Sequence, residues 1–285
     1  TRRGIAYAYS DKYKKKTLRL GDLLHLDKPH IQSRLKTMLE YKNLELGGCY
    51  HQAPMSYPAL LSWCEKKAEQ FAPYITDTGN YIAAALSNHQ KVVLEAQLGA
   101  MRDIDYGIFP YTSSSSTISA YGPIGAGIPG TLPDHIVGVL KAYSTCVGAG
   151  PFTAEKAMPE KWMESLRKSG GEYGAATGRP RRVGPFDAVA SAYGLKCQNA
   201  DKIALTKLDV LSHMDEIPVI TSYKLNDEII TEFDPLDDLD SMTPVTQMLP
   251  GWNTDISKCR KYEELPENAR KYIETLEHLL NHEIL

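Results

Sequence analysis

The stretch Lys202–Asp209, K-I-A-L-T-K-L-D, decides the fold class of this chain. It opens with a short apolar run of the kind that forms a strand buried on both faces. Similar runs occur at Lys91–Glu95 and Pro218–Tyr223, and segments with helical periodicity separate them. Buried strands that alternate with helices indicate an α/β protein with a largely parallel central sheet flanked by helices.

Helical periodicity is strongest near the beginning of the chain. Apolar residues three or four positions apart, with capping signals such as Ser56 before Pro58, predict helices. The helical segments are 31–43, 57–74, 77–86, 133–143, 159–168, 187–197 and 266–280. A β-hairpin is expected where Asn226-Asp227 precedes Glu228–Ile230. We expect a single domain over residues 1–285, with a mainly helical lobe at 1–89 and a sheet-containing core at 90–285.

The composition is that of a globular protein and argues against several classes of function. Lys and Arg total 32 against 35 Asp and Glu, and this net charge of −3 argues against a generic binder of nucleic acid or of an anionic membrane. No apolar stretch approaches the roughly 20 residues that a membrane span needs. The five cysteines form no C-x-x-C motif, which fits a reducing compartment, so a cytoplasmic location is expected. The histidines show no zinc-ligand spacing.

The second half of the opening stretch, Thr206-Lys207-Leu208-Asp209, is a T-K-x-D sequence at the end of a predicted strand. Such a carboxylate can accept two parallel hydrogen bonds from N1–H and the exocyclic amine of guanine, while the Lys stem lies along the base. Adenine offers the opposite donor pattern and would leave the carboxylate unpaired. The structural alternative is a strand that ends in a solvated Lys and Asp.

Three further segments have ligand-binding character. Gly174–Arg182 contains two glycines and a cluster of three arginines, which suits bidentate capture of phosphate or carboxylate. Glu95–Thr117 follows a predicted strand with Gly- and hydroxyl-rich loops, where ligands bind in open α/β sheets. Lys141–Phe152 contains glycines that let a backbone approach a ligand. The alternatives are a basic surface loop, a Ser-rich turn and a tight turn.

Together these segments resemble the adenylosuccinate synthetase family. The family's T-G-R-G-I is similar to Thr1–Ile5, and its K-A-Y-S-T-x-V-G-A-G-P-F matches 141–152. Its G-A-T-T-G-R-x-R-R and T-K-L-D-V-L blocks resemble 174–182 and 206–211, and M-P-G-W resembles 248–252. The resemblance extends essentially from Thr1 to Leu285, and several blocks in one order are far more specific than any single motif.

The resemblance implies a reaction in which GTP, IMP and L-aspartate give adenylosuccinate, GDP and phosphate. In the family, a carboxylate base deprotonates purine N1, O6 takes the γ-phosphoryl group, and the aspartate amine displaces that phosphate at C6. Mg²⁺ is the expected cofactor. A homodimer is expected, and no nucleic acid or membrane partner. The core at 90–285 would then bind the nucleotides.

The resemblance also assigns site residues by position. Those expected to contact IMP are Thr1, Lys15, Gln97, Ser113, Val147 with Gly148, and Arg179. Those expected to bind aspartate are Thr177, Arg179 and Arg181, and those expected to bind GTP are Arg181, Lys207 and Asp209. Lys15 stands where the family has an Arg that reaches the IMP phosphate of the partner subunit.

Some positions depart from the family pattern. The family's E-G-A-Q-G is Glu95–Gly99 here, so its IMP-contacting Gln aligns on Leu98 and the amide lies one residue earlier, at Gln97. Ala176 replaces one aspartate-loop hydroxyl. The Gly-rich G-D-E-G-K-G loop with the catalytic Asp, and the catalytic His, are expected before Thr1, and a guanine-closing segment after Leu285. The chain is therefore expected to be the middle of the enzyme, with no catalytic residue or metal ligand assigned in it.

Two other classes of function remain open at this point. The first is a non-catalytic protein, or fragment, that binds purine nucleotides. The second is a GTPase switch protein, because T-K-x-D alone fits one, although the sequence contains no G-x-x-x-x-G-K-[ST] motif.

Overall fold

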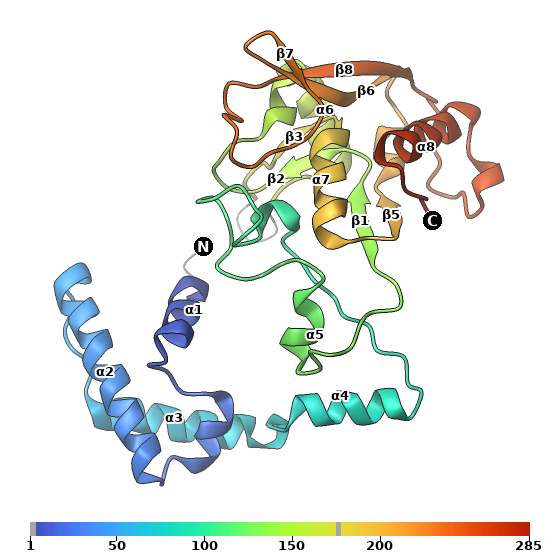
Figure 1. Ribbon diagram of the computed structural model, residues 1–285. Coiled ribbons are helices and arrows are strands. Elements are labelled where there is room, and N and C mark those ends of the chain that lie inside the picture. The colour runs from blue at the N-terminus through green and yellow to red at the C-terminus, as the bar shows by residue number, and fades with distance from the viewer. Residues whose placement is uncertain (1–3, 175–177) are drawn as a thin grey trace. The chain divides into compact units, whose positions relative to one another are not determined.

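The computed structural model describes residues 4–174 and 178–285 (Figure 1). The chain divides into two compact units. Unit 1 comprises Thr1–Leu94 and Pro123–Gly130, and unit 2 comprises Glu95–Gly122 and Thr131–Leu285. No helix of the described residues is both long and apolar enough to cross a membrane.

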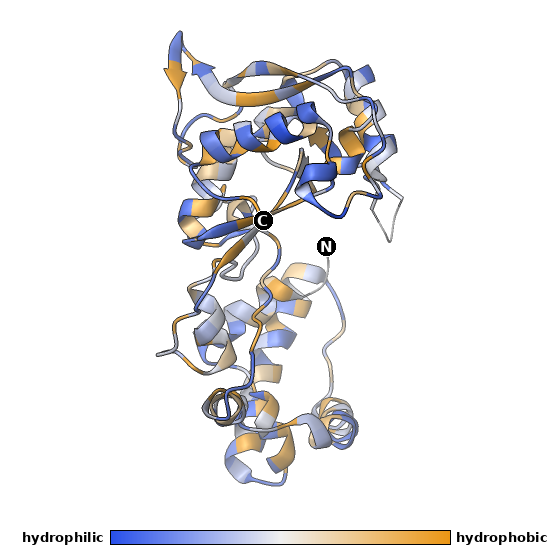
Figure 2. Ribbon diagram, turned by 90° about the vertical axis from the view of Figure 1, so that its right-hand side faces the viewer, coloured by the Kyte–Doolittle hydropathy of each residue, from blue (hydrophilic) through white to orange (hydrophobic). Residues whose placement is uncertain are grey.

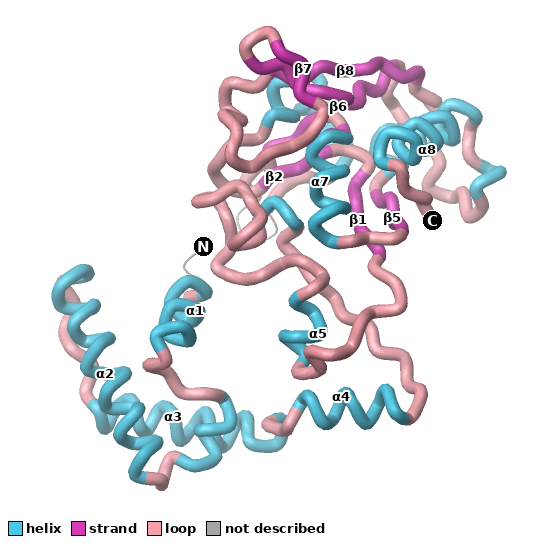
Figure 3. The backbone as a smooth tube through the Cα atoms, in the orientation of Figure 1, coloured by secondary structure: helices cyan, strands magenta, loops and turns pink. Residues whose placement is uncertain are grey.

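Unit 1 is built from helices (Figure 3). They are α1 (Ile5–Lys14), α2 (Pro29–Tyr50), α3 (Tyr57–Phe71), α4 (Thr78–Ser87) and part of the short α5 (Tyr121–Ala126). Helix α3 begins as expected, because Ser56 Oγ accepts a hydrogen bond from the Ala59 amide at 3.4 Å. Asp77 caps α4 in the same way at 3.0 Å. The helices predicted at 31–43, 57–74 and 77–86 are confirmed.

In unit 2, β1 (Val137–Lys141) and β5 (Lys202–Thr206) lie side by side and run parallel, with Val137 opposite Lys202 and Lys141 opposite Thr206 (Figure 1). The predicted strand at 202–207 is thus confirmed, whereas the predicted helix at 133–143 is wrong. Its apolar residues belong to β1, where β-branched side chains fit. Gly138 explains the close packing, because a Cβ there would lie 2.6 Å from Leu195 Cδ2 on α7 (Ala188–Gln198).

A second sheet contains both kinds of pairing. Strand β4 (Phe186–Asp187) runs parallel to β6 (Glu216–Leu225), while β7 (Glu228–Ile230) and β8 (Thr243–Pro250) run antiparallel to β6. The predicted hairpin is confirmed, and both turn residues, Asn226 and Asp227, have positive φ. The α/β class with parallel strands is therefore confirmed, and the long β6–β8 pairing adds an antiparallel edge.

The strand predicted at Lys91–Glu95 is wrong. Within the described residues no strand pairs with this segment, and a strand is defined by such pairing. Val93 is 88% exposed, so the apolar run is not a buried one here.

Helices α6 (Glu160–Gly170) and α8 (Glu267–Leu280) close the core of unit 2 together with the antiparallel pair β2 (Ser144–Cys146) and β3 (Arg182–Gly184). Helix α8 buries Ala269, Tyr272, Ile273, Leu276 and Leu280, which recur at helical spacing. Figure 2 shows that helices of the chain carry both hydrophobic and hydrophilic residues, as amphipathic helices do. The helices predicted at 159–168, 187–197 and 266–280 are confirmed.

Candidate functional site

A buried carboxylate organises the edge of the β1–β5 pair. Glu172 is 2% exposed and lies just after α6, whose C-cap is Gly171 with a φ of 62°. Its Oε1 atom accepts hydrogen bonds from Lys141 Nζ at 2.7 Å and from Tyr143 OH at 2.6 Å. Its Oε2 atom accepts one from Arg181 Nη1 at 3.0 Å. One carboxylate thus holds side chains that come from the end of β1, from the turn after it and from the arginine-rich loop.

The electrostatics of this cluster keep Glu172 and Tyr143 each in one protonation state. Burial by itself raises the pKa of Glu172, but hydrogen bonds from Lys141 and Tyr143, with the charges of Lys141 and Arg181, outweigh it and hold that pKa below its usual value. Burial and the hydrogen bond to Glu172 raise the pKa of Tyr143 well above its usual value. At neutral pH the carboxylate is therefore ionised and the phenol is a donor.

The T-K-L-D segment lies at the same edge. Strand β5 ends at Thr206, opposite Lys141, and Thr206 Oγ1 donates to the Leu140 carbonyl at 3.0 Å. Lys207 adopts a left-handed φ of 63°, which ends the strand, and its Nζ atom donates to the Gly170 carbonyl at 3.4 Å. The charge of Asp209 contributes to the raised pKa of Tyr143, so Asp209 lies near the cluster. Lys207, Asp209 and Arg181 are thus gathered at the carboxyl ends of parallel strands, where α/β proteins bind ligands.

Both ends of the arginine-rich loop, Gly174–Arg182, lie at this edge. Tyr173 and Pro180 form an antiparallel bridge, and the Gly174 amide donates to the Arg179 carbonyl at 2.8 Å. Arg179 therefore lies on a closed excursion of the chain next to Arg181. Thr177, predicted to bind aspartate, lies outside the described residues, as does Thr1.

The other loops predicted to bind IMP meet at Arg102. The Ser113 amide donates to the Arg102 carbonyl at 2.8 Å, and Ser113 Oγ lies 2.7 Å from Ser115 Oγ. Arg102 Nη2 donates to the Val147 carbonyl at 3.1 Å, and Gly148 follows with a φ of 92°. Arg102 therefore links the two loops: its backbone carbonyl binds Ser113, and its side chain binds Val147, which precedes Gly148.

Gln97 and Lys15 are exposed. The backbone turns just after Gln97, because Leu98 adopts a left-handed φ of 76°. The Leu98 side chain is 60% exposed. Lys15 ends helix α1 with a φ of 59° in unit 1. Among the described residues, no hydrogen bond or ion pair joins Gln97 or Lys15 to another predicted site residue of the same unit.

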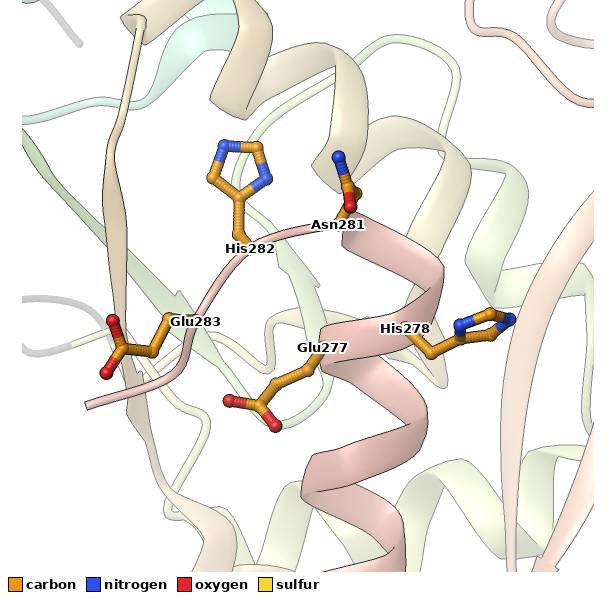
Figure 4. Close-up of a pocket in the computed structure, with 5 residues that line it drawn as sticks. All are labelled: Glu277, His278, Asn281, His282 and Glu283. Atoms are coloured by element: carbon orange, nitrogen blue, oxygen red, sulfur yellow. The ribbon is translucent and has the colours of Figure 1, made fainter.

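Two of the hollows in unit 2 bear on where the site lies. One, of about 410 Å³, is lined by Glu155, Arg167, Arg181, Arg182 and neighbouring residues, so it adjoins the arginine-rich loop. The other, of about 390 Å³, lies at the end of α8 (Figure 4). Figure 4 shows that its Glu277 and His278 point away from each other. His282 is already engaged, with its ring nitrogens 2.7 and 3.0 Å from the carbonyls of Leu280 and Ala200. We therefore place the candidate site at the β1–β5 edge.

The described part of the chain contains no group of three or more His, Cys, Asp or Glu side chains that could hold a metal ion. The charged side chains gathered at the β1–β5 edge, among them Arg181, Lys207 and Asp209, are of kinds that can recognise anions and polar base edges.

Comparison with known proteins decides the family. The family model described as "Adenylosuccinate synthetase" matches residues 1–285. The chain belongs to the adenylosuccinate synthetase family. The family resemblance drawn from the motifs is thereby confirmed.

Relatives within this family show how much of the chain is covered. The adenylosuccinate synthetase of Carboxydothermus hydrogenoformans is 40% identical over 280 residues, which are 98% of this chain and 65% of that protein. That of Halothermothrix orenii is 38% identical over 281 residues, again 98% and 65%. The structure of the fully ligated adenylosuccinate synthetase from Plasmodium falciparum matches with a TM-score of 0.88 and 33% identity, and the match covers 99% of this chain and 66% of that chain. The chain thus spans just under two thirds of the length of these relatives.

Sequence reasoning missed Glu172, Tyr143 and Arg102 as members of the site. Glu172 and Lys141 are 31 residues apart, so only the fold brings them together. The sequence signal that could have pointed to Glu172 is its position, because it is an acidic residue between Gly170-Gly171, which ends a helix, and the arginine cluster.

Proposed function

We propose that this chain is the central part of an adenylosuccinate synthetase, a GTP-dependent ligase that joins L-aspartate to IMP through a 6-phosphoryl-IMP intermediate in AMP biosynthesis in the cytoplasm. The observation that carries the proposal is the meeting of the T-K-L-D segment with Arg181 and Lys141 around Glu172, in a chain of this family. That edge offers a base-reading carboxylate and fixed cations, which a phosphoryl transfer from GTP requires.

Asp209 reads the guanine of GTP in this proposal. Its carboxylate accepts hydrogen bonds from N1–H and the exocyclic amine, and the stem of Lys207 lies along the base. Support comes from the position of both residues just beyond β5. Lys207 directly follows the strand with a left-handed φ, and Asp209 lies in the short 3-10 helix Leu208–Leu211 that comes next. A rigid strand end limits the movement of the two side chains, and so favours guanine over adenine.

Arg179, Arg181 and Thr177 bind L-aspartate, and Arg181 also contacts GTP. Support comes from the ion pair of Arg181 with Glu172, which fixes the guanidinium before a ligand arrives. A guanidinium held in place stabilises negative charge on the transferring phosphoryl group without reorganising. Arg179, on the closed excursion of the same loop, lies between aspartate and IMP.

IMP is held by Thr1, Gln97, Ser113, Val147, Gly148 and Arg179, and by Lys15 from the partner subunit of a homodimer. Support for a dimer comes from helices α1 to α3, where large apolar side chains stay exposed, among them Tyr13 at 73%, Leu44 at 71% and Trp63 at 57%. Large apolar side chains left exposed on these helices are surface that contact with a second subunit would cover.

The base that deprotonates purine N1, and the family's catalytic His, are proposed to lie outside this sequence. Mg²⁺, when bound, neutralises charge on the phosphates of GTP, and its ligands are proposed to lie mostly outside this sequence as well. The residues of this chain bind and orient the three substrates.

The test uses the full-length natural protein that contains this chain. IMP, GTP, Mg²⁺ and L-aspartate are mixed with it, and the rise in absorbance on formation of adenylosuccinate is followed, with reactions lacking GTP or aspartate as controls. A rise that needs all three substrates supports the ligase. A protein that binds IMP and GTP in equilibrium dialysis but gives no product in the assay is a purine-nucleotide-binding protein, and the proposal is then wrong.

A further inference from the structure

Arg102 joins the two loops that are proposed to hold IMP. Its guanidinium donates to the carbonyls of Tyr111, Val147 and Ala149, at 3.1 Å for Val147 and 3.5 Å for Ala149, and lies 2.9 Å from Cys146 Sγ. We infer that Arg102 is a positioning residue for a purine nucleoside monophosphate, because it sets the spacing of these two loops. This inference rests on the proposed function and adds a residue to its IMP site.

Both loops need such a link because neither contains regular structure where it would meet the ligand. Residues 109–118 contain no helix or strand, and 147–152 follow β2 with glycines at φ 92° and 106°. Val147 is 69% exposed, so packing of its side chain does little to hold the second loop. Three hydrogen bonds to backbone carbonyls from one rigid guanidinium fix the loops relative to each other.

The backbone of Arg102 is itself held firmly. Its carbonyl accepts the Ser113 amide at 2.8 Å, which connects the first loop a second time. The next residue, Asp103, is fully buried and accepts the amides of Asp105, Tyr106 and Thr117 at 2.9, 3.1 and 2.6 Å. The Arg102 side chain therefore leaves a rigid turn, and the spacing that it sets is well defined.

The charge of Arg102 also favours an anionic ligand. Among the described residues no carboxylate forms an ion pair with it, and its described acceptors are carbonyls and a thiol. Arg182 provides the contrast, because it holds the Gly150 carbonyl at 2.6 Å from the same loop but is neutralised by Glu155. A half-buried cation without a counter-ion, beside Ser113 and Val147, raises the local affinity for a phosphate-bearing ligand.

The experiment compares Arg102→Met and Arg102→Lys with the parent in the full-length protein. Arg102→Met removes both the charge and the hydrogen bonds, whereas Arg102→Lys keeps the charge. The matched control is Arg260→Met, because Arg260 Nη1 likewise donates to two carbonyls, of Ser257 and Cys259, in a loop with no proposed ligand.

We expect Arg102→Met to raise the KM for IMP by roughly tenfold or more, with the KM values for GTP and aspartate within about twofold of the parent. The KM for IMP of Arg102→Lys should lie between those of the parent and Arg102→Met, and the KM for IMP of Arg260→Met should equal that of the parent. Backbone amides of 111–115 and 146–150 should exchange hydrogen faster in Arg102→Met, and those of 257–260 should not.

Unchanged exchange in both loops of folded Arg102→Met, or equal rises in all three KM values, would overturn the inference. If Arg102→Met does not fold, the hydrogen exchange of both loops and the three KM values are measured on Arg102→Lys instead, and the same outcomes decide. A parent that makes no adenylosuccinate refutes the proposed function instead. In that case the exchange data, with the binding of IMP measured by calorimetry, still test the role of Arg102.

Discussion

Glu172 accepts a hydrogen bond from Arg181 Nη1 at 3.0 Å, and the Nε atom of the same guanidinium is buried with no hydrogen-bond partner among the described residues. The carboxylate therefore orients a guanidinium that still has a donor to offer. An unmet buried donor costs free energy unless a ligand or water satisfies it. The ion pair therefore fixes the orientation of the Arg181 guanidinium at the edge where the substrates are proposed to bind.

Glu172→Gln should weaken this arrangement. The amide keeps the shape of the side chain but loses the charge that holds Arg181 and Lys141, so we expect the KM for aspartate and for GTP to rise by roughly tenfold. Steady-state kinetics of the full-length protein measure the change. Glu155→Gln is the matched control, because it releases the neighbouring Arg182. Equal effects of the two variants would contradict a specific role of Glu172.

Asp209→Asn should change the base that is recognised. The variant loses the acceptor for guanine N1–H and gains a donor, which suits xanthine, so GTP affinity should fall roughly 100-fold while a xanthine nucleotide binds better. Competition binding of GTP and xanthosine triphosphate provides the measurement. Asp201→Asn, an exposed position just before β5, is the control. GTP affinity that stays unchanged in Asp209→Asn would remove Asp209 from the site.

Arg179→Leu should separate catalysis from folding. Arg179 lies on an excursion closed by the Tyr173–Pro180 bridge and is exposed, so the core does not depend on it. We expect turnover to fall by orders of magnitude and the melting temperature to stay nearly unchanged. Activity assays and thermal melts of the same preparations check both. A variant that unfolds would assign Arg179 a structural role.

Local signals predicted six of the seven expected helical segments correctly, and also the end of the strand at T-K-L-D. Ser56 with Pro58 marks the start of α3, and Gly170-Gly171 marks the end of α6, because caps act within one turn. The segment 133–143 failed because Ile136, Val137, Val139 and Leu140 fit a helical face and a strand equally well. Only its pairing with β5 and the contact of Gly138 with Leu195 decide the matter.

Long-range pairing explains what the sequence did not indicate. Strand β8 was not predicted, and its prolines at 244 and 250 argue against a strand. They are tolerated because, in the described part of the chain, β8 pairs with β6 alone and so lies at an edge of the sheet. The Glu172 cluster joins residues from separate elements, so no spacing along the chain reveals it. Contiguous motifs locate Lys207, Asp209 and Arg181, and the fold supplies the carboxylate that connects them.

A mixing experiment tests the proposed homodimer. If Lys15 reaches the IMP of the partner subunit, Lys15→Ala and Arg179→Leu each damage a different half of a shared site. Heterodimers of the two variants then contain one intact site, and mixing should restore part of the activity. Analytical ultracentrifugation with one labelled chain confirms that heterodimers form. No recovery in confirmed heterodimers would show that each site is built within one subunit.

Asp187 is the buried N-cap of α7. Its carboxylate accepts the Ala190 amide at 3.0 Å and the Tyr223 hydroxyl at 2.7 Å. Burial raises the pKa of Asp187 to about 6, against the opposing effect of these hydrogen bonds. Because the folded pKa lies above the unfolded one, the protonated form is favoured by folding. The stabilisation is complete below about pH 4 and is lost as the pH rises through about 6.

Asp187→Asn should therefore be more stable than the parent at pH 7 and similar to it near pH 4. The neutral amide still caps the helix through its oxygen, and it carries no charge into the core. The difference at pH 7 is on the order of 3 kcal/mol from the pKa shift. Urea unfolding of both proteins from pH 4 to pH 8 measures it, with Asp77→Asn, at the exposed N-cap of α4, as the control. A stability difference between Asp187→Asn and the parent that does not change with pH would show that folding leaves the pKa of Asp187 unchanged, because only a proton taken up on folding makes the difference grow between the two pKa values.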